Sequence, residues 1–316
     1  MGIADYALAR PAGRRTVDEV SRASEYTTEK LAQILPSGTF SVLADGETSW
    51  GLGLTAARAV LRRTPVPLDE IGLVIYAGSS EWGTPFWSPA AKIAGELGVR
   101  DAHCFEVSNF CNAGMVAVKL ADDQVRAGAH RHALVIVTDR LSRLVDYSTG
   151  YFELFNFADG AAAVLVSAER SRYEVLGAAH HTDPQWVDSY YGVLRDGEVK
   201  VERGDKLDGL GEAFLENFTR LTHEVLSGIG AGVDDVAHFL VTHGNQDTQR
   251  KYLAELGVPA ERSVFQYHLD GHLGGADPFQ ALRELEDEDR VHSGDLIVVA
   301  TAGSGFTWGV TALRHV

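Results

Sequence analysis

Cys111 is the residue whose position best fits nucleophilic chemistry. It follows an apolar run at 103–107 and opens a stretch with helical periodicity at 112–126. The unsatisfied N–H groups and the positive end of the helix dipole favour a thiolate at such a position. The small residues Ala113 and Gly114 behind it would let another chain segment or a substrate approach closely. The pattern therefore predicts a reactive thiol in a strand-to-helix turn.

Two histidines could assist this thiol. His243 follows a predicted buried strand, at the strand end where α/β folds commonly place active sites. His272 lies in a glycine-rich turn. A thiol with two imidazoles can supply a nucleophile, a general base and an electrostatic stabiliser. His268 and His272 have the spacing of a zinc pair, but Asp270 and Gly271 between them break a helix and no third ligand is evident, so no metal is expected.

An internal repeat relates the thiol to the second histidine. The tetrapeptide at 96–99 returns unchanged at 255–258. An acidic pair and an apolar run precede each copy, and a β-like run leads from each copy to a turn of small residues. One turn carries Cys111 and the other carries His272. The chain is therefore interpreted as two copies of one α/β unit, with reactive residues at equivalent places.

Periodicity predicts the elements that position these residues. Helices are expected at 55–63, 88–97, 112–126, 211–226, 248–256 and 278–285. Strands are expected at 73–77, 103–107, 133–138, 161–166, 239–242, 263–267, 296–300 and 308–313. Apolar strands that alternate with amphipathic helices indicate buried sheets with helices on both faces. We therefore expect a duplicated α/β fold, five-layered α/β/α/β/α with two mixed sheets.

The two halves have expected boundaries. Residues 1–168 form the N-terminal half with the cysteine, and residues 169–316 form the C-terminal half with the histidines. The polar, turn-rich stretch at 170–209 is predicted to be the seam between them or a long excursion.

Composition narrows the class of protein. The net charge of −16, from 28 basic and 44 acidic residues, argues against nucleic-acid binding. The apolar runs are far shorter than a membrane span, and no signal peptide is visible. Cys104, in mid-strand, fits a buried structural cysteine, and two cysteines seven positions apart make no disulfide framework. A reduced, cytoplasmic protein is expected.

The chain resembles the thiolase-fold ketosynthases, and most closely the 3-oxoacyl-acyl-carrier-protein synthase III group. The resemblance extends from about Leu68 onward. It rests on the segments Phe105–Gly114, Ala158–Ala163, Thr242–Asn245 and Gly303–Gly309. The last of these is a specific signature of the family.

This resemblance implies a mechanism and a homodimer. Cys111 would take an acyl group from a phosphopantetheine thioester of coenzyme A or of an acyl carrier protein. The N–H groups of Cys111 and Gly305 would form the oxyanion hole. His243 and His272 would then handle a small-molecule acceptor, and Asn245 would be a binding residue for the carried substrate. No separate cofactor, nucleic acid or membrane is expected.

Aromatic residues supply candidates for an acyl pocket, with ordinary packing as the alternative for most of them. The candidates are Trp82, Phe86, Trp87, Phe157 and Phe306. In the family, the segment that matches 82–87 lies at the dimer interface and reaches the partner's acyl pocket.

Two departures from the family pattern bear on the acceptor. The usual asparagine of the second turn aligns with His272, and a Cys-His-His set occurs in elongating ketosynthases. Family members that acylate a hydroxyl or amine can carry an acidic residue nearby, which makes Asp277 a possible orienter of His243. Asp277 also precedes Pro278, and we favour its role as a helix N-cap. The region 18–46 lacks the tryptophan and arginine with which the family clamps the adenine of coenzyme A, so either the donor is a carrier protein or coenzyme A is held differently. Together with the unusual second turn, this departure suggests a specialised biosynthetic pathway.

Three hypotheses follow. The leading one is acyl transfer through an acyl-Cys111 thioester, with a slight preference for decarboxylative carbon–carbon condensation with a malonyl thioester. The second is transfer to a hydroxyl or amine of a natural-product intermediate, for which Asp277→Asn should be severe. The third is a non-catalytic ketosynthase-like partner subunit.

Overall fold

The computed structural model describes residues 1–148, 150–242, 246–265 and 270–316. The predictions for His243, Asn245 and His268 therefore concern residues outside the described ones.

Strands of the N-terminal half form one side of the main sheet, in the order β1-β7-β6-β4-β5. These strands are β1 (Gly2–Ala9), β4 (Ile71–Gly78), β5 (His103–Ser108), β6 (His132–Arg140) and β7 (Asp159–Ser167). β4 runs parallel to β5 and β6, whereas β7 is antiparallel to β6 and β1. The apolar side chains of β4, β6 and β7 are buried on both faces, as expected for a sheet covered by helices on both sides, whereas those of the edge strand β5 are half-buried.

Strands of the C-terminal half repeat this arrangement in the order β11-β12-β13-β8. They are β8 (Tyr173–Thr182), β11 (Val236–Thr242), β12 (Leu296–Gly303) and β13 (Thr307–His315). β11 and β12 are parallel, and the other neighbours are antiparallel. The halves are joined edge to edge where Ile3 of β1 pairs with Tyr173 of β8, so that nine strands are continuous.

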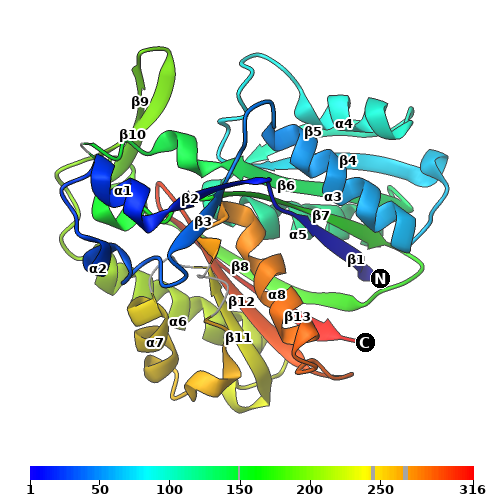
Figure 1. The fold of residues 1–316 in the computed structure, drawn as a ribbon. Coiled ribbons are helices and arrows are strands. Elements are labelled where there is room, and N and C mark those ends of the chain that lie inside the picture. The colour runs from blue at the N-terminus through cyan, green and yellow to red at the C-terminus, as the bar shows by residue number, and fades with distance from the viewer. Residues whose placement is uncertain (149, 243–245, 266–269) are drawn as a thin grey trace.

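Helices complete the predicted five layers (Figure 1). α3 (Ser49–Arg63) and α4 (Pro89–Leu97) cover the outer face of the first set of strands. α6 (Leu210–Gly228) packs on β8 and β13, and α7 (Gln246–Glu255) packs on α6. α5 (Ala113–Arg126) and α8 (Asp277–Asp287) contact strands of both halves and form the middle layer. The duplicated fold is confirmed, and its middle layer holds the largest apolar core.

The strand predicted at 263–267 does not form over its described residues, 263–265. Ser263 makes only an isolated bridge to Phe239, and no strand includes Val264 or Phe265. The side-chain amide of Gln249 donates to the Ser263 hydroxyl at 2.7 Å and to the Val264 carbonyl at 2.9 Å. This carbonyl is therefore bonded to a side chain rather than to a neighbouring strand, and no strand among the described residues of the second half corresponds to β5.

The predicted seam at 170–209 contains more structure than its polarity suggested. It holds β8 and a hairpin of β9 (Tyr190–Arg195) and β10 (Glu198–Arg203), which projects from the molecule in Figure 1. Asp196 and Gly197 at its tip have φ of 50° and 82°, the left-handed values that a tight two-residue hairpin turn requires.

The N-terminal region adds a small layer beside the core. It comprises β2 (Gly13–Thr16), α1 (Val17–Ala23), α2 (Thr28–Leu31) and β3 (Thr39–Val42). Thr16 and Glu19 cap the start of α1 reciprocally. Among the described helices, none is long and apolar enough to cross a membrane.

Candidate active site

Cys111 lies in a sharp turn between β5 and α5. The turn is a 3₁₀ segment, Phe110–Asn112, and Phe110 has a φ of 51°, a left-handed value that costs a non-glycine residue energy. Buried Asn112 holds the turn, because its amide donates to Asn109 Oδ1 at 2.7 Å and its oxygen accepts a hydrogen bond from Thr301 of β12. The C-terminal half thus fixes the turn that presents the thiol.

Two glycines bring the thiol turn and the histidine turn together. A Cβ at Gly114 would lie 2.4 Å from the Gly275 carbonyl oxygen. A Cβ at Gly275 would lie 2.9 Å from the side chain of Val137 and 3.1 Å from the Gly114 nitrogen. The expectation that Gly114 allows close approach is confirmed, and the segment that approaches is the turn carrying His272.

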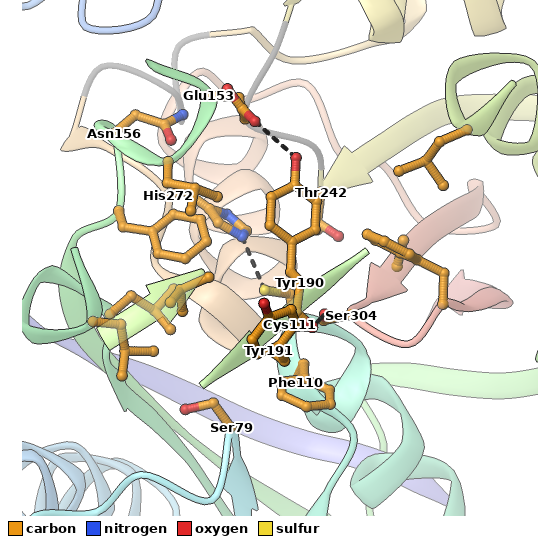
Figure 2. Close-up of a pocket in the computed structure, with 18 of the residues that line it drawn as sticks. Ser79, Phe110, Cys111, Glu153, Asn156, Tyr190, Tyr191, Thr242, His272 and Ser304 are labelled. Atoms are coloured by element: carbon orange, nitrogen blue, oxygen red, sulfur yellow. Dashed lines mark hydrogen bonds between the residues drawn. The ribbon is translucent and has the colours of Figure 1, made fainter. Parts of the chain in front are cut away.

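His272 is held by backbone and by side chain. Its N–H donates to the Asn156 carbonyl at 2.7 Å, and its carbonyl accepts from the Ala158 N–H at 2.9 Å. Its Nε2 lies 3.0 Å from Cys111 Sγ, and its Nδ1 lies 2.5 Å from Asp277 Oδ2 (Figure 2 shows the contact with Cys111). The three side chains form a continuous chain of hydrogen bonds: thiol, imidazole, carboxylate.

The favoured role of Asp277 as a helix N-cap is wrong. Ala276 is the N-cap of α8, and Asp277 is the first helical residue. The Asp277 side chain turns back to the preceding loop, where Oδ1 accepts the Leu273 N–H at 2.8 Å and Oδ2 binds His272. Asp277 therefore orients His272, and its predicted contact with His243 involves a residue outside the described ones. Because a carboxylate only accepts hydrogen bonds, Nδ1 of His272 carries the proton and Nε2 faces the sulfur.

The charges around His272 favour its cationic form. Burial alone would lower the pKa of His272, but the Asp277 carboxylate and the Cys111 sulfur outweigh burial and raise this pKa well above its ordinary value. With its Nε2 3.0 Å from Cys111 Sγ, His272 is placed to exchange a proton with the thiol. Cys104 differs, because burial raises the pKa of its thiol, its sulfur donates a hydrogen bond to the Ala102 carbonyl at 3.6 Å, and its side chain packs against an apolar cluster. The structural reading of Cys104 agrees with these surroundings.

A largely apolar cavity of about 550 Å³ opens beside Cys111 and His272. Two of the five proposed pocket residues, Phe157 and Phe306, line it, together with Phe110, Phe152 and Phe214. The other three do not line it within this chain. Trp82 packs against Tyr76 and Trp87 packs against Trp50, with ring centroids 5.5 Å and 6.1 Å apart, while Phe86 is fully exposed.

The β9–β10 hairpin closes one side of this cavity, which sequence reasoning missed. Tyr190 and Tyr191 of β9 and Val201 of β10 line the cavity. The Tyr190 hydroxyl donates to Glu153 Oε1 across the cavity wall at 2.9 Å (Figure 2). The Asp196–Gly197 dipeptide is a strong hairpin signal that could have revealed this element.

The proposed oxyanion donor Gly305 lies in the turn between β12 and β13. It has a φ of +117°, and the preceding residue, Ser304, lines the cavity. Its pairing with the Cys111 N–H stays a prediction. In the described part of the chain, no cluster of three or more metal-ligating side chains occurs.

Comparison with known proteins agrees with this geometry. The models of 3-oxoacyl-[acyl-carrier-protein] synthase III and of its C-terminal region match residues 105–184 and 226–315. A β-ketoacyl-[acyl-carrier-protein] synthase III of Sphingopyxis alaskensis is 32% identical over 85% of this chain and 84% of its own. One of Rhizobium meliloti is 29% identical over 98% and 97%.

Solved structures share the whole fold at lower identity. The 3-oxoacyl-[acyl-carrier-protein] synthase III of Aquifex aeolicus superimposes with a TM-score of 0.89 at 22% identity, over 99% of both chains. The priming β-ketosynthase of the R1128 polyketide pathway gives 0.88 at 22%, over 99% of this chain and 96% of its own. With the thiol in its strand-to-helix turn and the duplicated sheet, these matches establish that the chain belongs to the 3-oxoacyl-[acyl-carrier-protein] synthase III family.

Proposed function

We propose that this protein is an acyltransferase that carries an acyl group on Cys111 and passes it to a hydroxyl or amino group of a small molecule. The observation that carries this proposal is the hydrogen-bonded chain from Cys111 through His272 to Asp277. The same constellation of nucleophile, imidazole and carboxylate recurs on unrelated folds that perform acyl transfer.

The first half-reaction loads the enzyme. The Cys111 thiolate attacks the carbonyl carbon of a phosphopantetheine thioester, carried by coenzyme A or by an acyl carrier protein. The C–S bond to the pantetheine breaks, and the leaving thiolate takes the proton from the His272 imidazolium. The N–H groups of Cys111 and Gly305 would stabilise the oxyanion between these steps, a contribution of about 3 kcal/mol per donor. The thioester is consumed as substrate, and no separate cofactor is required.

The second half-reaction transfers the acyl group. Neutral His272 accepts the proton of the acceptor O–H or N–H as that atom attacks the acyl carbon. The bond to Cys111 breaks, and the thiolate–imidazolium pair is restored. Asp277 holds His272 in the correct tautomer and stabilises the imidazolium that forms in this step, as a general base requires.

The Asp277 carboxylate supports one type of acceptor over the other. Loss of carbon dioxide from a malonyl group creates a carbon nucleophile without a base, whereas a hydroxyl or amine must lose a proton to a base. A histidine bound to a buried carboxylate is suited to the second task. The geometry therefore shifts the preference from condensation, which the sequence slightly favoured, to transfer onto oxygen or nitrogen.

Decarboxylative condensation is the second candidate. Its support is the family, whose similar members are named as β-ketoacyl synthases, and the cationic His272, which could donate a hydrogen bond to an enolate oxygen. In either case a specialised biosynthetic pathway in the cytoplasm remains our expectation, because His272 and Asp277 occupy a turn that departs from the usual family pattern.

Intact-protein mass spectrometry with a panel of acyl-coenzyme A and acyl-carrier thioesters tests the proposal. We expect a mass increase that Cys111→Ala abolishes and that added alcohols or amines discharge without release of carbon dioxide. Release of carbon dioxide from malonyl thioester, with a lengthened carbon chain as product, would establish condensation instead. A thiol that no donor acylates would favour the non-catalytic partner subunit.

We also propose a homodimer. β5 ends the sheet with one unpaired edge, and the fully exposed Phe86 lies in the segment that the family places at the dimer interface. Exposed strand edges and large exposed aromatic side chains are commonly covered by partners.

A further inference from the structure

Three hydroxyl groups of the cavity lining already donate their protons to the protein. The Tyr190 hydroxyl donates to Glu153 Oε1 at 2.9 Å, and the Thr242 hydroxyl donates to the Ala300 carbonyl at 3.3 Å. The Ser304 hydroxyl reaches the Tyr190 carbonyl at 3.5 Å. Each of these three oxygens therefore offers the cavity lone pairs rather than a proton, so a bound molecule must supply the hydrogen-bond donor at these positions.

The acidic side chains of the described lining also favour a ligand that supplies hydrogen-bond donors. Glu81 and Glu153 line the cavity, and no lysine or arginine does. Arg140 holds Glu81 at 2.5 Å and Arg203 holds Glu153 at 3.1 Å, both from outside the lining. These arginines reduce the negative charge without presenting a cation to the ligand. The one cation of the described lining is the His272 imidazolium, which is already paired with Asp277.

Aromatic rings and branched aliphatic side chains share the rest of the described lining. The rings are those of Phe110, Phe152, Phe157, Tyr190, Tyr191, Phe214 and Phe306. Such walls favour flat or cyclic apolar ligands, because ring contacts add to the gain from burying apolar surface.

Glu153 lies where a free acceptor could reach it. Its side chain is 39% exposed and that of Arg203 is 41% exposed, so this side of the cavity opens to solvent. Glu153 Oε1 accepts from both Tyr190 and Arg203, while Oε2 has no hydrogen bond among the described residues. A ligand hydroxyl or ammonium group can bind Oε2 without breaking these contacts.

We propose that Glu153 and Tyr190 form the subsite that binds the acceptor. The acceptor is an aromatic or alicyclic molecule that carries hydroxyl or amino groups and no carboxylate or phosphate. This inference rests on the proposed transfer to oxygen or nitrogen, and it names the class of molecule that receives the acyl group.

Three probes that differ only in charge test this subsite: tyramine, which is cationic, tyrosol, which is neutral, and 4-hydroxyphenylacetate, which is anionic. Each is titrated for its ability to protect Cys111 from iodoacetamide, a neutral reagent, with alkylation followed by intact mass. We expect tyramine and tyrosol to protect at concentrations about 10-fold lower than 4-hydroxyphenylacetate, a difference of about 1.4 kcal/mol.

Glu153→Gln is the informative variant, because it keeps the shape of the side chain and removes its charge. We expect it to reduce the ratio between tyramine and 4-hydroxyphenylacetate to about 3-fold or less. Glu202→Gln is the matched control. Glu202 lies on β10 of the hairpin that carries Tyr190 and accepts a hydrogen bond from Tyr151 at 3.0 Å, but it does not line the cavity, so the ratio should not change.

The outcomes separate this inference from the proposed function. Equal protection by the three probes, protection by none, or a Glu153→Gln ratio equal to that of the wild type would overturn the subsite. Protection does not depend on acyl transfer. If the charge preference is found but tyramine and tyrosol fail to discharge acyl-Cys111, the subsite stands and transfer to a heteroatom is wrong.

Discussion

At the scale of single residues, the chemistry depends on one proton on His272. The Asp277 carboxylate and the Cys111 sulfur outweigh burial in setting its charge. In the proposed mechanism His272 can act as a base only when it is neutral. Discharge of the acyl-enzyme should therefore rise with pH as the pH passes through the pKa of His272.

Asp277→Asn should move that rise to lower pH, because it removes a charge that raises the pKa of His272, and should reduce the maximal rate on the order of 10²-fold. The measurement is the pH profile of acyl-Cys111 discharge. Asp159→Asn is the control, because Asp159 is an equally buried carboxyl that binds Ser142 and the Leu43 N–H. If Asp277→Asn kept the wild-type pH profile, the Asp277 carboxylate would have no role in the mechanism.

At the scale of elements, activity depends on how closely the α5 turn and the turn before α8 approach. The contact between Gly114 and the Gly275 carbonyl leaves no room for a methyl group. Gly114→Ala should cost about 1–3 kcal/mol of unfolding free energy through overpacking. By moving Cys111 away from His272, it should also slow alkylation of the thiol at neutral pH.

The control for this prediction is Gly95→Ala in α4, where a Cβ meets nothing within 4 Å. This change should stabilise the protein by up to about 1 kcal/mol, because alanine is the better helix former, and should leave alkylation unchanged. Chemical denaturation and timed iodoacetamide labelling measure both effects. Equal stability and equal labelling of Gly114→Ala and wild type would show that the two turns can separate without cost.

At the scale of the whole molecule, the unpaired edge of β5 and the exposed Phe86 argue for self-association. Phe86→Asp should weaken a dimer at least about 10-fold, since it places a charge in an apolar contact. Leu194→Asp on the hairpin is the control, because Leu194 is also exposed, at 75%, but lies outside the segment proposed for the interface. Sedimentation of the wild type and of both variants at several concentrations measures how strongly each one associates. A monomeric wild type, or equal association of both variants, would contradict the proposed interface.

The sequence by itself determined the duplicated fold, the strand-to-helix turn at Cys111 and the importance of His272. Periodicity and a tetrapeptide repeat are local patterns, and they report burial and chain direction directly. The same local reasoning assigned Asp277 to a helix cap, because a residue before Pro278 fits that role. It also read 263–267 as a strand, although the Gln249 side chain bonds the Val264 carbonyl.

Only the tertiary structure decided which partners these residues have. Asp277 contacts His272 because the loop before α8 folds back on its own first turn, and Cys111 reaches His272 because Gly114 and Gly275 let two distant turns meet. The β9–β10 hairpin closes the cavity through the bond between Tyr190 and Glu153, 37 positions apart. Such contacts are fixed by packing between elements, and spacing along a chain carries no information on them.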